Sequence, residues 1–154
     1  MIHIYEEIAG AIAGIDELQW IDIAPRNENH TNVYPAAYIG INGQRPLNPL
    51  GAMNGIAEVD FSIEVWLKPY HSSAAKPLSP VIADLKNNFN LIAQIRNAIM
   101  NCDGEFVGGT TLISEIVEKQ EDGFYRVIQN WGCVTQMWVT EFEQQETKPD
   151  VEFG

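Results

Sequence analysis

The sequence has few basic residues: nine Lys and Arg stand against 21 Asp and Glu, which gives a formal net charge of −12. Because nucleic-acid phosphates are bound by clustered cations, this scattered and outnumbered set argues against a protein that grips DNA or RNA. Cysteine is scarce as well. Cys102 and Cys133 have no CxxC partner and no histidine at ligand spacing, so both are expected to be largely buried thiols in a reducing compartment.

Long apolar runs are missing too. The longest, IAGAIAGI, is far shorter than the about 20 residues that a membrane-spanning helix needs. The N-terminal stretch MIHIYEEIAG has neither a basic leader nor a long apolar core. We therefore expect a soluble, cytoplasmic protein with no membrane partner, in which the glycosylation triplet at Asn29 is a chance match.

The motifs of common catalytic and nucleotide-binding sites are also missing. The chain contains no GxxxxGK, no GxGxxG after a strand, no GxSxG and no HExxH. His3, His30 and His71 lie far apart in a terminus and two loops, and exposed loop histidines are their ordinary interpretation. The sequence thus predicts no catalytic residue, no cofactor and no metal site, in a protein that is not an enzyme.

Two segments that are present have the apolar spacing of amphipathic helices. The first covers residues 3–14, and the second runs from Ser79 to Asp103, with Pro80 suited to its first turn. The apolar stripe of the second helix consists of Leu85, Phe89, Ile92, Ile95 and Ile99.

Strands are predicted at residues 20–24, 33–41 and 57–67 and in two runs on either side of the turn EDG. Two long loops, 42–55 and 68–80, separate them, and Gly132 is the expected bulge or bend in the last run. The fold class is therefore α+β: a single domain over residues 1–142, with an antiparallel or mixed β-sheet and two main helices packed on one face. The acidic segment 143–154 is expected to be a flexible tail.

Charge decides the register of the final hairpin. A two-residue turn would place Lys119 directly opposite Arg126, and like charges across a pair of strands are destabilising. A three-residue turn with Gly123 in the left-handed position avoids this clash. It predicts the pairs Glu118–Arg126 and Ile116–Ile128.

The segment AEVDFSIEVWLK, residues 57–68, alternates without a fault, so its apolar residues share one side of a strand. Glu58, Asp60 and Glu64 share the other side. Three interpretations are open: a cation or acid–base site, the ordinary solvated face of a sheet, or a negative surface that repels a partner. Acid–base or metal chemistry lacks a nearby histidine or a second acidic cluster here.

Aromatic and apolar residues remain for the second face of the sheet, which two helices cannot cover. Trp66, Tyr125, Trp131 and Trp138 are therefore candidate contacts with another copy of the chain or with a partner. The other possibility is that the long loops fold back over this face.

Taken in order, the first helix, the segment VYPAAYIGING, the strand AEVDFSIEVWLK, the helix SPVIADLKNNFNLIAQIRNAI and the closing β-run resemble the tail terminator (tail completion) proteins of tailed phages and prophages. The resemblance covers roughly residues 4–140 and consists of length, element order and hydrophobic signatures. It implies a non-enzymatic homo-oligomer, commonly a hexameric ring, that caps the tail tube and joins it to the head connector. Such a protein assembles in the cytoplasm and ends in the virion.

On this hypothesis Glu58, Asp60 and Glu64 line a channel or its rim, where negative walls repel the passing DNA. The alternative is a cytoplasmic binding module for a small ligand, with an apolar pocket lined by Trp66, Trp131 and Met137. An enzyme that uses Glu58 and Asp60 is the third hypothesis.

Overall fold

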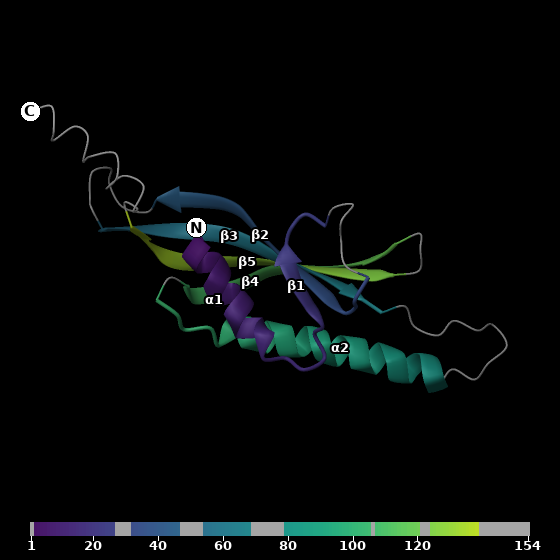
Figure 1. Cartoon of the computed structure of the whole chain (residues 1–154). Helices are drawn as coiled ribbons and strands as arrows, with labels where there is room; N and C mark the ends of the chain where they lie inside the picture. Colours follow the sequence, from purple (N-terminus) through teal and green to yellow (C-terminus); the bar gives the residue numbers. More distant parts are fainter. Residues whose placement is uncertain are drawn as a thin grey trace, which may run out of the picture.

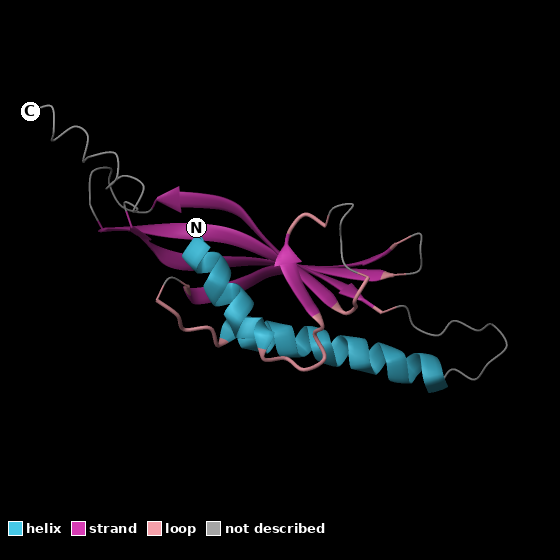
Figure 2. Cartoon of the chain, viewed as in Figure 1, coloured by secondary structure: helices cyan, strands magenta, loops and turns pink. Residues whose placement is uncertain are grey.

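The computed structural model describes residues 2–26, 32–46, 54–68, 79–105, 107–120 and 124–138. In chain order the elements are α1 (Ile2–Ala13), β1 (Trp20–Ile23), β2 (Ala36–Pro46), β3 (Asn54–Leu67), α2 (Ser79–Met100), β4 (Gly108–Lys119) and β5 (Tyr125–Trp138). These strands form one sheet in the order β1-β2-β3-β5-β4 (Figure 1, Figure 2). β1 runs parallel to β2, and the other neighbours are antiparallel. The predicted α+β fold with a mixed sheet is confirmed.

Both helices lie on the same side of the sheet (Figure 1). α1 packs against β2, α2 packs against β4, and the two helices contact each other. The alternating residues of β3 from Ala57 to Leu67 are buried beneath them, as the sequence predicts. We call this side the helix-covered face. The opposite side, which carries Glu58, Asp60, Ser62, Glu64 and Trp66 of β3, is the open face.

The apolar stripe of α2 is buried only in its C-terminal half. Ile92, Ile95 and Ile99 lie in the core together with Leu91, whereas Phe89 is 56% exposed. Phe89 therefore belongs to the predicted apolar stripe but not to the core. At 22 residues, α2 is about 33 Å long, and its N-terminal half carries apolar side chains beyond the part that packs on the sheet.

Half of the predicted loop 42–55 is strand, because β2 continues to Pro46 and β3 begins at Asn54. Residues 43–46 pair with residues 57–60 of β3, and Asn54 and Gly55 pair with β5. A bulge between Ile41 and Gly43 absorbs the irregular sequence. The Gly, Pro and Asn content of the segment is typical of loops, but pairing with the regular strand β3 outweighs it. Residues 47–53 and most of the second predicted loop, 69–78, lie outside the described residues, as does the tail 143–154.

The hairpin has the register that charge predicts, since Glu118 pairs with Arg126 and Ile116 with Ile128. Its turn, 121–123, lies outside the described residues. The prediction that a bulge at Gly132 divides the last run is wrong, because β5 passes this position in unbroken register with β3. The irregularities lie in the edge strand β4 instead, between Gly108 and Thr111 and between Leu112 and Ser114. Gly109, at the first of them, has a φ of 57°, a conformation that favours glycine.

Candidate functional site

Glu58, Asp60 and Glu64 lie together on the open face, half-buried and close to arginines of the neighbouring strands. Arg45 of β2 lies 2.8 Å from a carboxylate oxygen of Asp60 and 3.4 Å from one of Glu58. Arg126 of β5 lies 3.1 Å from Glu64. The three carboxylates are therefore ion-paired.

Arg126 also contacts Glu118 of β4, so it bridges two carboxylates. Hydrogen bonding to Glu118 is the main reason that the pKa of this guanidinium is raised. The sequence signal for this bridge is the predicted Glu118–Arg126 pair. The sequence does not indicate the role of Arg45, because its segment has the composition of a loop.

Trp66 lies on the open face within an aromatic cluster that also contains Tyr34, Tyr38 and Phe124. Its indole N–H donates to Glu64 at 2.8 Å, and the Arg26 guanidinium lies 3.9 Å from the centre of its ring. A tryptophan at a polar-face position is thus stabilised by a hydrogen bond and a cation–π contact. Trp66 is only 6% exposed, so its own chain already covers most of the surface that a partner was expected to contact.

The other aromatic candidates lie elsewhere. Trp131 is fully buried on the helix-covered face, stacked on Phe61, and cannot contact a partner as predicted. Tyr125 is half-buried and packs against the same core. For Trp138, the structure describes the backbone, which pairs with Asn54, while its side chain lies outside the description.

Both edge strands of the sheet carry exposed apolar side chains. Ile113, Ile116 and Val117 of β4 are 62%, 46% and 53% exposed, and we call these three residues the β4 apolar edge. On the opposite edge, Trp20 and Ile23 of β1 are 43% and 59% exposed. Each strand pairs along one side only within the described sheet, so backbone groups on its outer side have no ladder partner there.

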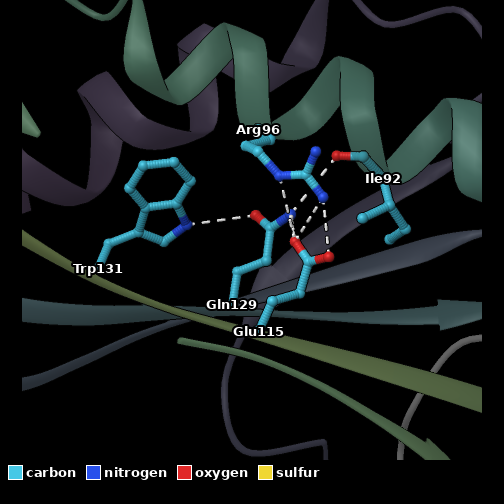
Figure 3. A network of polar contacts seen from close by, with 5 residues as sticks. All are labelled: Ile92, Arg96, Glu115, Gln129 and Trp131. Atoms are coloured by element: carbon cyan, nitrogen blue, oxygen red, sulfur yellow. Dashed lines mark hydrogen bonds and ion pairs between the residues drawn. The ribbon is translucent and has the colours of Figure 1, made fainter. Parts of the chain in front are cut away.

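A polar network crosses the helix-covered face between α2 and the sheet (Figure 3). Arg96 of α2 binds the carboxylate of Glu115, with its shortest contact at 2.8 Å. Gln129 donates to Glu115 at 3.0 Å and accepts a hydrogen bond from the Trp131 indole at 3.2 Å. Gln129 also donates to the carbonyl of Ile92 at 3.4 Å. The network fixes α2 above β4 and β5 and satisfies a fully buried amide.

Replacing Gln129 by leucine is expected to lower the free energy of unfolding by about 1–3 kcal/mol, because the Trp131 indole and the Glu115 carboxylate each lose a partner in a buried site. Chemical denaturation measures this loss. Asn130→Leu is the matched control, since the Asn130 amide bonds Ser114 on the open face. Equal losses of unfolding free energy in the two variants would contradict the expectation that the buried network stabilises the fold more than the Asn130–Ser114 hydrogen bond does.

The described residues do not form the apolar pocket of the binding-module hypothesis. Trp66 pairs with Arg126 on the open face, whereas Trp131 pairs with Phe61 on the helix-covered face, so the two rings lie on opposite sides of the sheet. The side chain of Met137 lies outside the description. A hollow of about 620 Å³ does lie between the loop after α1 and the N-terminal half of α2. Its lining is mostly polar and includes Glu17, Gln19, Asn87, Asn88, Asn90 and Gln94.

The titratable groups that metal or redox sites use are dispersed. His3 lies 3.8 Å from Glu6 on α1, while His30 and His71 lie outside the described residues. Cys102 is half-buried and Cys133 is buried, and both are free. Burial raises the pKa of the Cys133 thiol to about 11, which keeps it protonated at neutral pH. Within the described ranges, no group of three or more His, Cys, Asp and Glu residues is arranged to hold a metal ion.

Comparison with known proteins finds similarity among solved structures. No protein-family model matches the chain, and no curated protein matches it. Among solved structures, the chain is similar to a chain of the structure described as "Virion of native gene transfer agent (GTA) particle", with a TM-score of 0.45 and 12% identity over 87% of this chain and 92% of that chain. At this level the likeness assigns no function. In the described part of the chain, no helix combines the length and apolar character needed to cross a bilayer.

Proposed function

We propose that this chain is a structural protein of a phage or prophage particle, of the tail terminator type, which assembles with copies of itself into a ring. The ring caps the tail tube and joins it to the head connector, and a hexamer is the size that the sequence resemblance implies. The role is structural, without catalysis or a cofactor. Assembly takes place in the cytoplasm, and the ring becomes part of the virion.

The observation that carries this proposal is the β4 apolar edge. Three exposed apolar side chains, Ile113, Ile116 and Val117, lie along a sheet edge whose outer backbone groups are unpaired within the described sheet. Apolar surface at an unprotected strand edge favours pairing with another chain. A second copy of the protein is the simplest such chain. The order of elements that resembles tail terminators supports the proposal independently.

The open face suits the wall of a channel for DNA. Its carboxylates outnumber its guanidinium groups. The carboxylates belong to Asp22, Glu58, Asp60, Glu64 and Glu118, and the guanidinium groups to Arg26, Arg45 and Arg126. The ion pairs reduce the negative potential without reversing it, so phosphates are repelled while the face remains hydrated.

The experiment that tests this role compares binding to a short DNA duplex at low salt. The unsubstituted protein is expected to bind none, whereas Glu58→Gln/Asp60→Asn/Glu64→Gln is expected to bind it in a salt-sensitive way, because Arg45 loses both carboxylate partners. Fluorescence anisotropy of the labelled duplex reports the difference.

The matched control makes the same change of net charge away from the open face. Glu6→Gln/Asp16→Asn/Glu17→Gln alters exposed residues on α1 and in the loop after it. We expect this control to bind no DNA. If it binds as well as the open-face variant, net charge alone explains binding and the open face does not line the channel.

A further inference from the structure

Directly paired residues on neighbouring strands form rows across the sheet, and four such rows extend from β1 at one edge to β4 at the other. The first joins Trp20 of β1, through Ala36, Trp66 and Arg126, to Glu118 of β4. The next three rows start at Ile21, Asp22 and Ile23 and end at Val117, Ile116 and Glu115. All of β1 therefore lies at the same level of the sheet as the segment Glu115 to Glu118 on the opposite edge.

The directions of the two edge strands are also complementary. β1 is parallel to β2, and each of the three following steps across the sheet is antiparallel. β1 and β4 consequently run in opposite directions. A second copy placed beside the first in the same orientation thus brings its β1 against β4 as an antiparallel neighbour, the geometry in which the ladder hydrogen bonds run perpendicular to the strands.

The regular part of β4 coincides with this level. Its two bulges lie between Gly108 and Thr111 and between Leu112 and Ser114. From Ser114 to Lys119 the register with β5 is unbroken. The outer side of β4 can therefore accept a strand where β1 of the next copy would lie, and bulges interrupt it farther along.

On each face of the sheet, an apolar side chain of β1 has an apolar counterpart on β4. Ile23 and Val117 project on the helix-covered face, since their rows contain the buried residues Ile39 and Val127. Trp20 and Ile116 project on the open face, in the rows of Trp66 and Glu64. Pairing the edges would bury apolar side chains on both faces of the junction, where hydrophobic contact stabilises the strand pair.

We propose that copies of this chain join edge to edge, with β1 of one copy added antiparallel to residues 114–119 of the next, so that one β-sheet continues around the assembly. This inference rests on the proposed ring. The contact is heterologous, because each copy uses a different edge toward each neighbour, and such a contact closes into a ring when the rotation between copies closes. The occupant of Ile116 and Val117 in the β4 apolar edge is therefore the β1 edge of a second copy.

The test uses two singly substituted full-length chains, Ile23→Cys and Val117→Cys, and a short bis-maleimide cross-linker. In the proposed pairing these positions are diagonal neighbours on one face, about 7–8 Å apart. We expect covalent dimers in the mixture and loss of this product when either chain is treated alone. Phe89→Cys mixed with Ile23→Cys is the matched control for an exposed position away from both edges, and the unsubstituted protein controls for Cys102 and Cys133.

The outcomes separate the inference from the function on which it rests. Dimers from the mixture alone support edge-to-edge joining. Dimers from Val117→Cys alone or Ile23→Cys alone indicate a symmetric contact and overturn it. Rings visible by electron microscopy without any Ile23–Val117 product also overturn it, while the proposed ring stands. Absence of any oligomer, with or without tail tubes, overturns the proposed function itself.

Discussion

Replacing Trp131 by alanine is expected to lower the free energy of unfolding by about 3–5 kcal/mol, the range typical of removing a buried tryptophan. Trp131 is completely buried, and its ring is stacked on Phe61 with 6.2 Å between centroids. Its indole also donates to Gln129, so alanine removes core volume and leaves a buried amide oxygen without this donor. Urea denaturation followed by circular dichroism measures the change.

Two further variants make this measurement specific. Trp131→Phe retains most of the ring and is expected to cost less than alanine. Phe89→Ala removes an aromatic ring that is 56% exposed on α2, away from both sheet edges, and is expected to have a much smaller effect. If Trp131→Ala is no more destabilising than Phe89→Ala, Trp131 does not lie in the core.

Ile116→Lys/Val117→Lys is expected to abolish self-association, raising the dissociation constant between copies by about 100-fold or more. Burying an Ile or Val side chain contributes about 1.5–3 kcal/mol, and each lysine adds the cost of placing a charge in an apolar contact. The folded chain should persist, because both side chains are exposed in it. Analytical ultracentrifugation gives the constant, and circular dichroism verifies the fold.

Phe89→Lys is the matched control for this pair of substitutions. It adds a lysine at a site of similar exposure on α2, away from both sheet edges, and is expected to leave association unchanged. Association that survives in the Ile116→Lys/Val117→Lys variant, or that is lost equally in Phe89→Lys, would show that the β4 apolar edge is not the contact surface.

Much of the sheet could be predicted from local patterns. The alternation of β3 identifies its buried face, and the repulsion between Lys119 and Arg126 selects the hairpin register that the structure has. That register also implies the face of Trp131: if Arg126 faces the open side, every second residue after Val127 faces the helices. The predicted bulge or bend at Gly132 lies beyond Trp131, so it does not interrupt this alternation, and the hairpin register alone places Trp131 on the helix-covered face.

Other features depend on contacts between distant segments and could not be predicted. Arg45 lies in a stretch with the composition of a loop, and its ion pairs with Glu58 and Asp60 exist because β2 extends beyond a bulge to meet β3. The exposure of Phe89 depends on how far the core extends beneath α2. The helical periodicity of the sequence does not reveal this distance. The ion pairs of the β3 carboxylates therefore depend on the fold and could not be predicted from β3 alone.

The ion pairs with neighbouring strands also change the charge expected for the open face. Alternation in β3 predicts three carboxylates on one side, but two arginines from the neighbouring strands pair with them. The carboxylates of this face are therefore linked to the neighbouring strands by ion pairs. This character agrees with the proposed channel wall, and the proposal assigns the contact between copies to the apolar sheet edges.

The most direct test of the proposed ring is the mass of the purified protein in solution, measured by light scattering over a wide concentration range and compared with electron micrographs of the same sample. We expect a closed ring whose mass is a whole multiple of the chain mass and which dissociates to monomers in Ile116→Lys/Val117→Lys. A monomer at every concentration, with no rings on the ends of added tail tubes, would contradict it.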